Sequence, residues 1–114
     1  MYNRKTNNCW HAVLRCYKAY WGHDCPVQQQ GENPMEPVQI HRGALRLVKH
    51  FGLADRPRDG CIVLMSAKTI IHHFGFYQNG LIHISTERGD YSLNEQQAKE
   101  FGLGVIKYLN TEVV

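Results

Sequence analysis

The sequence predicts an α+β fold in which N-terminal helices pack on a mostly antiparallel sheet. Two segments, residues 8–21 and 40–51, repeat apolar side chains at the three- and four-residue spacing of an amphipathic helix. After residue 60, short apolar segments of strand length alternate with turn-forming residues. Helices followed by a strand meander indicate an α+β domain with the helices on one face of the sheet. A length of 114 residues suggests a single domain over residues 1–114 with one modest core.

The first helix is expected over residues 8–21. Asn7 or Asn8 can cap its start with a side-chain oxygen, and Gly22 can end it in the left-handed conformation. Its apolar stripe consists of Trp10, Val13, Leu14, Tyr17, Tyr20 and Trp21. Residues 26–37 are rich in Gln, Pro, Gly and Asn and are expected to form a loop.

The second helix is expected over residues 40–51 and closes at Gly52. Three strands should follow at 61–65, 70–77 and 81–85. Asn79-Gly80 between the last two favours a tight hairpin, because both residues tolerate positive φ.

The C-terminal part is expected to hold a turn, a helix and a last strand. The turn covers residues 87–90. Ser92 followed by Glu95 has the spacing of a capping box and predicts a short helix over 92–101. The final strand is predicted at residues 105–109.

Composition excludes several classes of protein. The net charge of +3 is scattered, without the dense basic run interleaved with aromatic residues that nucleic-acid binding favours. No apolar run is long enough to cross a bilayer, and the start of the chain leads into polar residues rather than a signal-peptide apolar stretch. We therefore expect no nucleic-acid or membrane partner and no use of the general secretion route.

Cys9 is the candidate nucleophile because it stands at the predicted start of a helix. Unpaired backbone N–H groups and the helix dipole there favour a thiolate over a thiol. Of the other cysteines, Cys16 and Cys61 fall in apolar patterns and are expected to be buried, whereas Cys25 lies in a loop. No C-x-x-C pair is present.

His73 is the candidate base for this thiol, and His83 its orienting partner. Strand alternation puts His73 and Gly75 on one face, which we expect to lie beneath the helix start, with His72 facing away. The hairpin brings His83 back alongside, where it can fix the tautomer of His73. A cysteine with a histidine base is the minimum set for acyl transfer through a thioester.

These residues carry a resemblance to the NlpC-type cell-wall cysteine peptidases, particularly small members associated with phage tails. Residues 8–15 (NCWHAVLR) resemble the start of the nucleophile helix, and residues 58–65 (RDGCIVLM) resemble the strand that follows in that family. Residues 73–77 (HFGFY) with 80–83 (GLIH) resemble the histidine hairpin, and residues 104–108 (GVIKY) resemble the closing strand. The order and spacing cover essentially the whole chain.

The resemblance implies a papain-like core, with Cys9 as nucleophile, His73 as general base and His83 as the third residue. It implies Tyr2 and Trp10 as candidate substrate contacts, with packing in the core or at its rim as the alternative for both. No metal or other cofactor is required by this chemistry.

The resemblance also implies hydrolysis of an amide bond in the peptide stem of peptidoglycan, commonly between D-glutamate and a diamino acid. The expected partners are the stem peptide and other phage tail proteins. The protein would be made in the cytoplasm and act at the bacterial cell wall after delivery, within a virion tail.

Other functions remain open on the sequence alone. One is a toxin-like cell-wall amidase injected into a rival cell, and another is a non-catalytic tail-assembly or tail-tip component that retains the fold. A zinc site formed by Cys9, His73 and His83 is a further alternative. If the chain is a cysteine peptidase, His72 is the alternative to His73 as the base.

Overall fold

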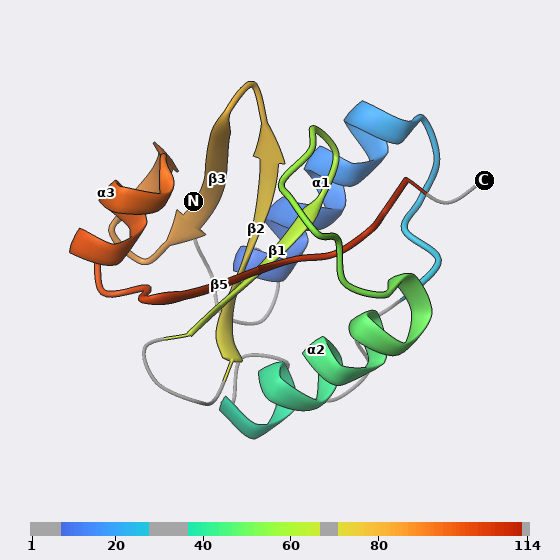
Figure 1. The fold of residues 1–114 in the computed structure, drawn as a ribbon, viewed down its shortest axis with the longest axis horizontal. Helices are drawn as coiled ribbons and strands as arrows, with labels where there is room; N and C mark the ends of the chain where they lie inside the picture. Colours follow the sequence, from blue (N-terminus) through green and yellow to red (C-terminus); the bar gives the residue numbers. More distant parts are fainter. Residues whose placement is uncertain (1–7, 28–36, 67–70, 113–114) are drawn as a thin grey trace.

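The computed structural model describes residues 8–27, 37–66 and 71–112 and shows an α+β fold in which helices pack on an antiparallel sheet (Figure 1). The elements follow in the order α1 (Cys9–Trp21), α2 (Pro37–Phe51), β1 (Ile62–Ser66), β2 (Ile71–Gln78), β3 (Leu81–Thr86), β4 (Gly89–Leu93), α3 (Glu95–Glu100) and β5 (Val105–Tyr108).

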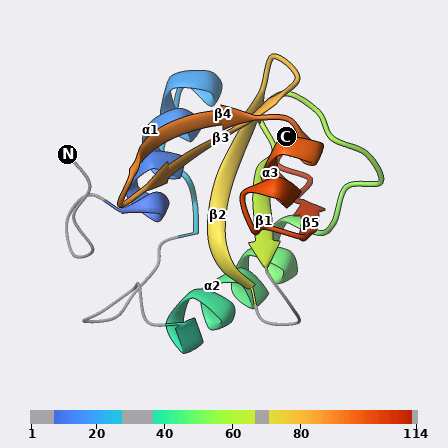
Figure 2. The same ribbon diagram turned by 90° about the vertical axis from the view of Figure 1, so that its left-hand side faces the viewer.

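The five-stranded sheet has the order β4-β3-β2-β1-β5, and each neighbouring pair is antiparallel. Helices α1 and α2 pack on one face, mainly against β2. Helix α3 lies on the other face beside β3 and β4, as the two views show (Figures 1 and 2). The two N-terminal helices pack on one face of the sheet as expected, and the late short helix α3 covers the other face.

Helix α1 begins and ends as its sequence predicts. Asn8 is the N-cap, and its side-chain oxygen accepts from the backbone N–H groups of Trp10 at 3.0 Å and His11 at 3.1 Å. The His11 ring returns the contact by accepting from the Asn8 N–H, so a histidine takes the place of Glu in a capping box. Gly22 closes the helix with φ of 82° and donates to the Lys18 carbonyl.

Helix α2 begins at Pro37, three residues before the predicted start at 40. Proline suits the first helical position because it lacks the N–H that would have no helical partner there. The predicted loop 26–37 lies mostly outside the described residues.

The hairpin between β2 and β3 confirms the Asn79-Gly80 signal. Asn79 has φ of 57° and Gly80 has φ of 77°, and Gln78 pairs directly with Leu81. The register of this turn then continues to the pair of Phe76 with His83.

The region after β3 corrects the prediction of a turn followed by a helix over 92–101. Residues 89–93 form strand β4, which pairs with β3 from Thr86 opposite Gly89 to Ile82 opposite Leu93. Helix α3 begins later, and its capping box uses Asn94 and Gln97 in place of Ser92 and Glu95. Residues 89–93 form a strand despite the local helix signal, because the unpaired edge of β3 is available to them for backbone hydrogen bonds.

Two apolar clusters lie on opposite faces of the sheet. The cluster under α1 and α2 includes Cys9, Trp10, Leu47, Phe74 and Phe76. The cluster under α3 joins two side chains of β1, Val63 and Met65, with Ile82 and Ile84 of β3 and with Ala98 and Leu103. Strand β1 is buried along its whole length because it contributes to both.

In the described part of the chain, no helix has the length and hydropathy needed to span a membrane.

Candidate functional site

Cys9 is the first residue of α1 and is fully buried, with 0% of its surface exposed. Its thiol receives hydrogen bonds from the backbone of Phe74 on β2 and from the backbone of Trp10 and Cys9 at the start of the helix. The structure therefore places the thiol at the junction of α1 and β2, next in sequence to His73. This agrees with the expected approach of the helix start to that strand.

The protonation of Cys9 differs from the expectation of a thiolate. Burial raises the pKa of the Cys9 thiol to about 11, and the backbone hydrogen bonds from Phe74, Trp10 and Cys9 lower it by less. The helix start does favour the thiolate, but the loss of solvation at a fully buried sulfur outweighs it. In this structure the resting form at neutral pH is the thiol.

The face of β2 turned toward α1 is the opposite of the predicted one. Phe74 and Phe76 pack in the cluster beneath α1, whereas His73 pairs directly with Met65 of the cluster beneath α3. Directly paired residues of an antiparallel ladder share a face. The Cβ of His73 therefore lies on the α3 side of the sheet and not beneath Cys9.

His73 is half-buried, and its ring Nε2 is shielded from solvent. It lies next to an irregularity, because the register between β1 and β2 shifts between Met65 and Ser66. His72, which the sequence analysis considered as the competing base, lies at this shift.

Gly75 has a different role from the one expected. A Cβ built on Gly75 would lie 2.9 Å from methyl carbons of Ile82 and Met65 and 3.0 Å from one of Ile84. The missing side chain makes room for this cluster on the α3 side rather than for the helix start on the other side.

His83 does not contact His73 as predicted. It lies opposite Phe76, on the α1 side of the sheet. Its Nε2 lies 3.1 Å from the carbonyl oxygen of Gln78, and its Nδ1 lies 2.8 Å from the hydroxyl of Ser92. The hairpin register explains why His83 does not meet His73. Because His83 pairs with Phe76, it lies on the face of the sheet opposite to that of His73.

The predicted substrate contacts have separate outcomes. Trp10 is 3% exposed and packs edge-on against Phe74, with ring centroids 5.1 Å apart. It is a core residue here, which was the alternative to a substrate contact. Tyr2 lies outside the described residues.

The polar group around His83 has little signal in the sequence. Ser92 has the sequence context of a helix cap, whereas in the structure it lies in β4 opposite His83. The available signal was weak: in residues 89–93 only Tyr91 and Leu93 alternate as apolar positions.

The candidate zinc set is not assembled within the described residues, where no three His, Cys, Asp or Glu side chains converge as metal ligands would.

No protein-family model matches the chain, and no curated protein matches it either.

Proposed function

We propose that this chain is a cysteine endopeptidase or amidase with a papain-like, NlpC-type core that hydrolyses an amide bond in the peptide stem of peptidoglycan. We place it in a phage or prophage tail. One observation carries the proposal: Cys9 opens α1 with its thiol hydrogen-bonded to the backbone of Phe74, the neighbour of His73. The order of motifs and the packing of α1 on an antiparallel sheet support it.

In the proposed reaction, His73 takes the proton of the Cys9 thiol, and the sulfur attacks the carbonyl carbon of the amide. The backbone N–H of Cys9 stabilises the oxyanion. His73 then passes the proton to the leaving amine, and water hydrolyses the thioester to release the acid and the thiol.

This reaction requires His73 to reach the α1 side of the sheet. The first residues of β2 adjoin the register shift between Met65 and Ser66. A change of register by one residue turns a strand side chain to the other face. We propose that the acylating form differs from the present one at this point of β2, and we assign His83 no contact with His73.

The test uses purified peptidoglycan fragments, with released peptides identified by mass spectrometry. The wild type should produce a new stem-peptide fragment, and Cys9→Ala should lower its rate of formation at least about a thousandfold, because the nucleophile is lost. His73→Ala should have a similar effect. Cys16→Ala is the matched control, since Cys16 lies on the same helix and should be dispensable for cleavage.

Equal cleavage by wild type and Cys9→Ala would contradict the proposal. A full loss in Cys16→Ala but not in Cys9→Ala would move the nucleophile to the other cysteine of the helix.

The alternative of a non-catalytic tail component has its own support. Cys9 is fully buried with a pKa of about 11, and both ring nitrogens of His83 are engaged by Gln78 and Ser92. This alternative predicts no cleavage by wild type and no labelling of Cys9 by iodoacetamide in the folded protein at neutral pH. Cleavage that depends on Cys9 would exclude it.

A further inference from the structure

A pocket of about 300 Å³ opens between α1 and the strands β3 and β4, on the same side of the sheet as Cys9 but farther along the helix. Figure 2 shows α1 running beside these two strands. Its polar lining consists of Arg15, Cys16, His83, Ser85, Asp90 and Ser92. The volume is at the lower end for small-molecule sites and suits a ligand of amino-acid size.

One wall of the pocket is a hydrogen-bonded pair with defined donors. The Gln78 carbonyl can only accept, so the Nε2 of His83 donates to it at 3.1 Å. In the neutral ring Nδ1 is then an acceptor, and the Ser92 hydroxyl donates to it at 2.8 Å. The lone pairs of the Ser92 oxygen remain available to a ligand N–H or O–H group.

Ser85 adds a buried polar group to the same wall. It is 4% exposed and nevertheless lines the pocket. A serine hydroxyl can donate to a ligand carboxylate or accept from a ligand N–H group.

Charges of both signs lie on the pocket lining. The Arg15 guanidinium lowers the pKa of the Cys16 thiol and the Asp90 carboxylate raises it, so both charges lie near the same sulfur. Burial, the largest effect, raises that pKa. A ligand in the pocket would meet a cation from α1 and an anion from β4.

We propose that this pocket binds the zwitterionic head of an amino acid. The ligand carboxylate pairs with Arg15 and accepts from Ser85, while the ligand ammonium pairs with Asp90 and donates to the Ser92 oxygen. A ligand with only one of the two charges can make only one of these two charge-assisted contacts. This site is independent of the proposed peptidase function, because none of these contacts involves Cys9.

The experiment is a titration of the ¹⁵N-labelled full chain, followed by amide chemical shifts. The probes are both enantiomers of alanine, with propionate and ethylamine as analogues that lack the ammonium and the carboxylate. At least one enantiomer of alanine should saturate shifts of α1, β3 and β4, and each analogue should bind at least about tenfold more weakly.

Two pocket variants and one control complete the test. Arg15→Gln and Asp90→Asn should each weaken alanine binding about tenfold, since each removes one charge-assisted contact. Lys18→Gln is the matched control, because Lys18 is an exposed cation one turn along α1 that pairs with Asp24 at 3.5 Å. It should leave the affinity unchanged.

Equal affinity for alanine and propionate would overturn the proposal in favour of a plain anion site. Shifts confined to other parts of the molecule, or no saturable binding of either enantiomer, would also overturn it. None of these results depends on cleavage of peptidoglycan, so the two proposals can fail separately.

Discussion

At the scale of single residues, Cys9 shows two opposing effects on one sulfur. Its position at the helix start supplies backbone hydrogen bonds that favour the thiolate, and its complete burial disfavours any charge. Burial dominates, so the thiol form contributes to the stability of the fold. A raised pKa in the folded state has a measurable consequence above pH 9.

The stability of the protein should fall between pH 9 and 11 through Cys9. The thiol ionises near 9.0 in the unfolded chain and near 11 in the folded one. The contribution of Cys9 is thus complete below pH 9 and is lost as the pH rises toward 11, which amounts to about 2–3 kcal/mol. Urea unfolding in the presence of a reductant, at pH 8 and pH 11, measures this loss for wild type against Cys9→Ala.

The remaining thiols titrate in both proteins, so the difference between the two losses of unfolding free energy from pH 8 to pH 11 isolates Cys9. Equal losses in the two proteins would show that the sulfur of Cys9 is solvated in solution.

Gly75 provides a second prediction at this scale. The methyl group of Gly75→Ala would approach side-chain carbons of Ile82, Met65 and Ile84 to within 3.0 Å, so that packed side chains must shift. We expect a loss of about 1–3 kcal/mol in the free energy of unfolding. Gly104→Ala is the control, since a Cβ there meets nothing within 4 Å. Equal stability of the two variants would contradict the close packing described at Gly75.

At the scale of elements, the caps show how local chemistry positions the site. Asn8 begins α1 and is itself fully buried, so it orients the turn that carries Cys9. Asn94 begins α3 with a capping box at an exposed position, and its side chain accepts from the N–H of Gln97. The two caps differ in burial and in the number of backbone N–H groups that the asparagine side chain satisfies.

Asn8→Ala should therefore destabilise the protein more than Asn94→Ala. Loss of a cap costs about 0.5–2 kcal/mol, and we place Asn8 near the upper end and Asn94 near the lower end. Removing the Asn8 side chain also leaves the N–H groups of Trp10 and His11 without their acceptor. Urea unfolding of both variants at pH 7 provides the comparison, and a larger loss for Asn94→Ala would contradict it.

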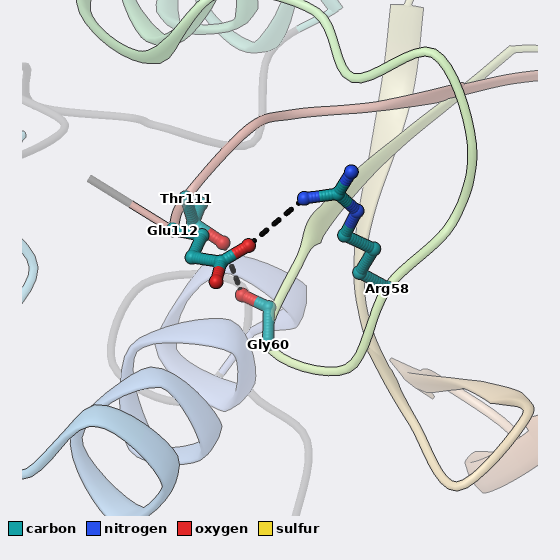
Figure 3. Close-up of polar contacts among 4 residues, drawn as sticks. All are labelled: Arg58, Gly60, Thr111 and Glu112. Atoms are coloured by element: carbon teal, nitrogen blue, oxygen red, sulfur yellow. Dashed lines mark hydrogen bonds and ion pairs between the residues drawn. The ribbon is translucent and has the colours of Figure 1, made fainter.

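At the scale of the whole molecule, the Gly60 carbonyl joins three distant parts of the chain. It accepts from the indole N–H of Trp21 at the end of α1, at 3.0 Å, and from the hydroxyl of Thr111 in the C-terminal segment. Beside it, Arg58 and Glu112 form an exposed ion pair at 3.0 Å (Figure 3). The buried hydrogen bond between Thr111 and Gly60 and the exposed ion pair between Arg58 and Glu112 both connect the loop before β1 to the C-terminal segment.

Thr111→Val removes the buried hydroxyl and should lower the free energy of unfolding by about 1–2 kcal/mol. Arg58→Gln breaks only the exposed ion pair and should change it by less than about 1 kcal/mol. Thermal or urea unfolding of the two variants measures both changes in the free energy of unfolding. A larger effect of Arg58→Gln would mean that the ion pair holds the C-terminal segment.

The sequence by itself determined the local elements. The apolar spacing around Trp10, the Asn8 cap, the Gly22 end and the Asn79-Gly80 hairpin act over a few residues, and all four appear as predicted. It also determined that Cys9 opens a helix packed on the strand of His73, because two long amphipathic helices need a sheet to cover.

Only the tertiary structure decided which face of each strand meets which helix. Alternation along β2 separates Phe74 from His73 but does not say which of them lies beneath α1. That choice follows from packing, because the two phenylalanines fill the space under the helices whereas Gly75 leaves room for the cluster on the other side. The partner of His83 and the existence of β4 likewise depend on pairing between strands. Such pairing is not a local property of the chain, which is why His83 meets Ser92 and not His73.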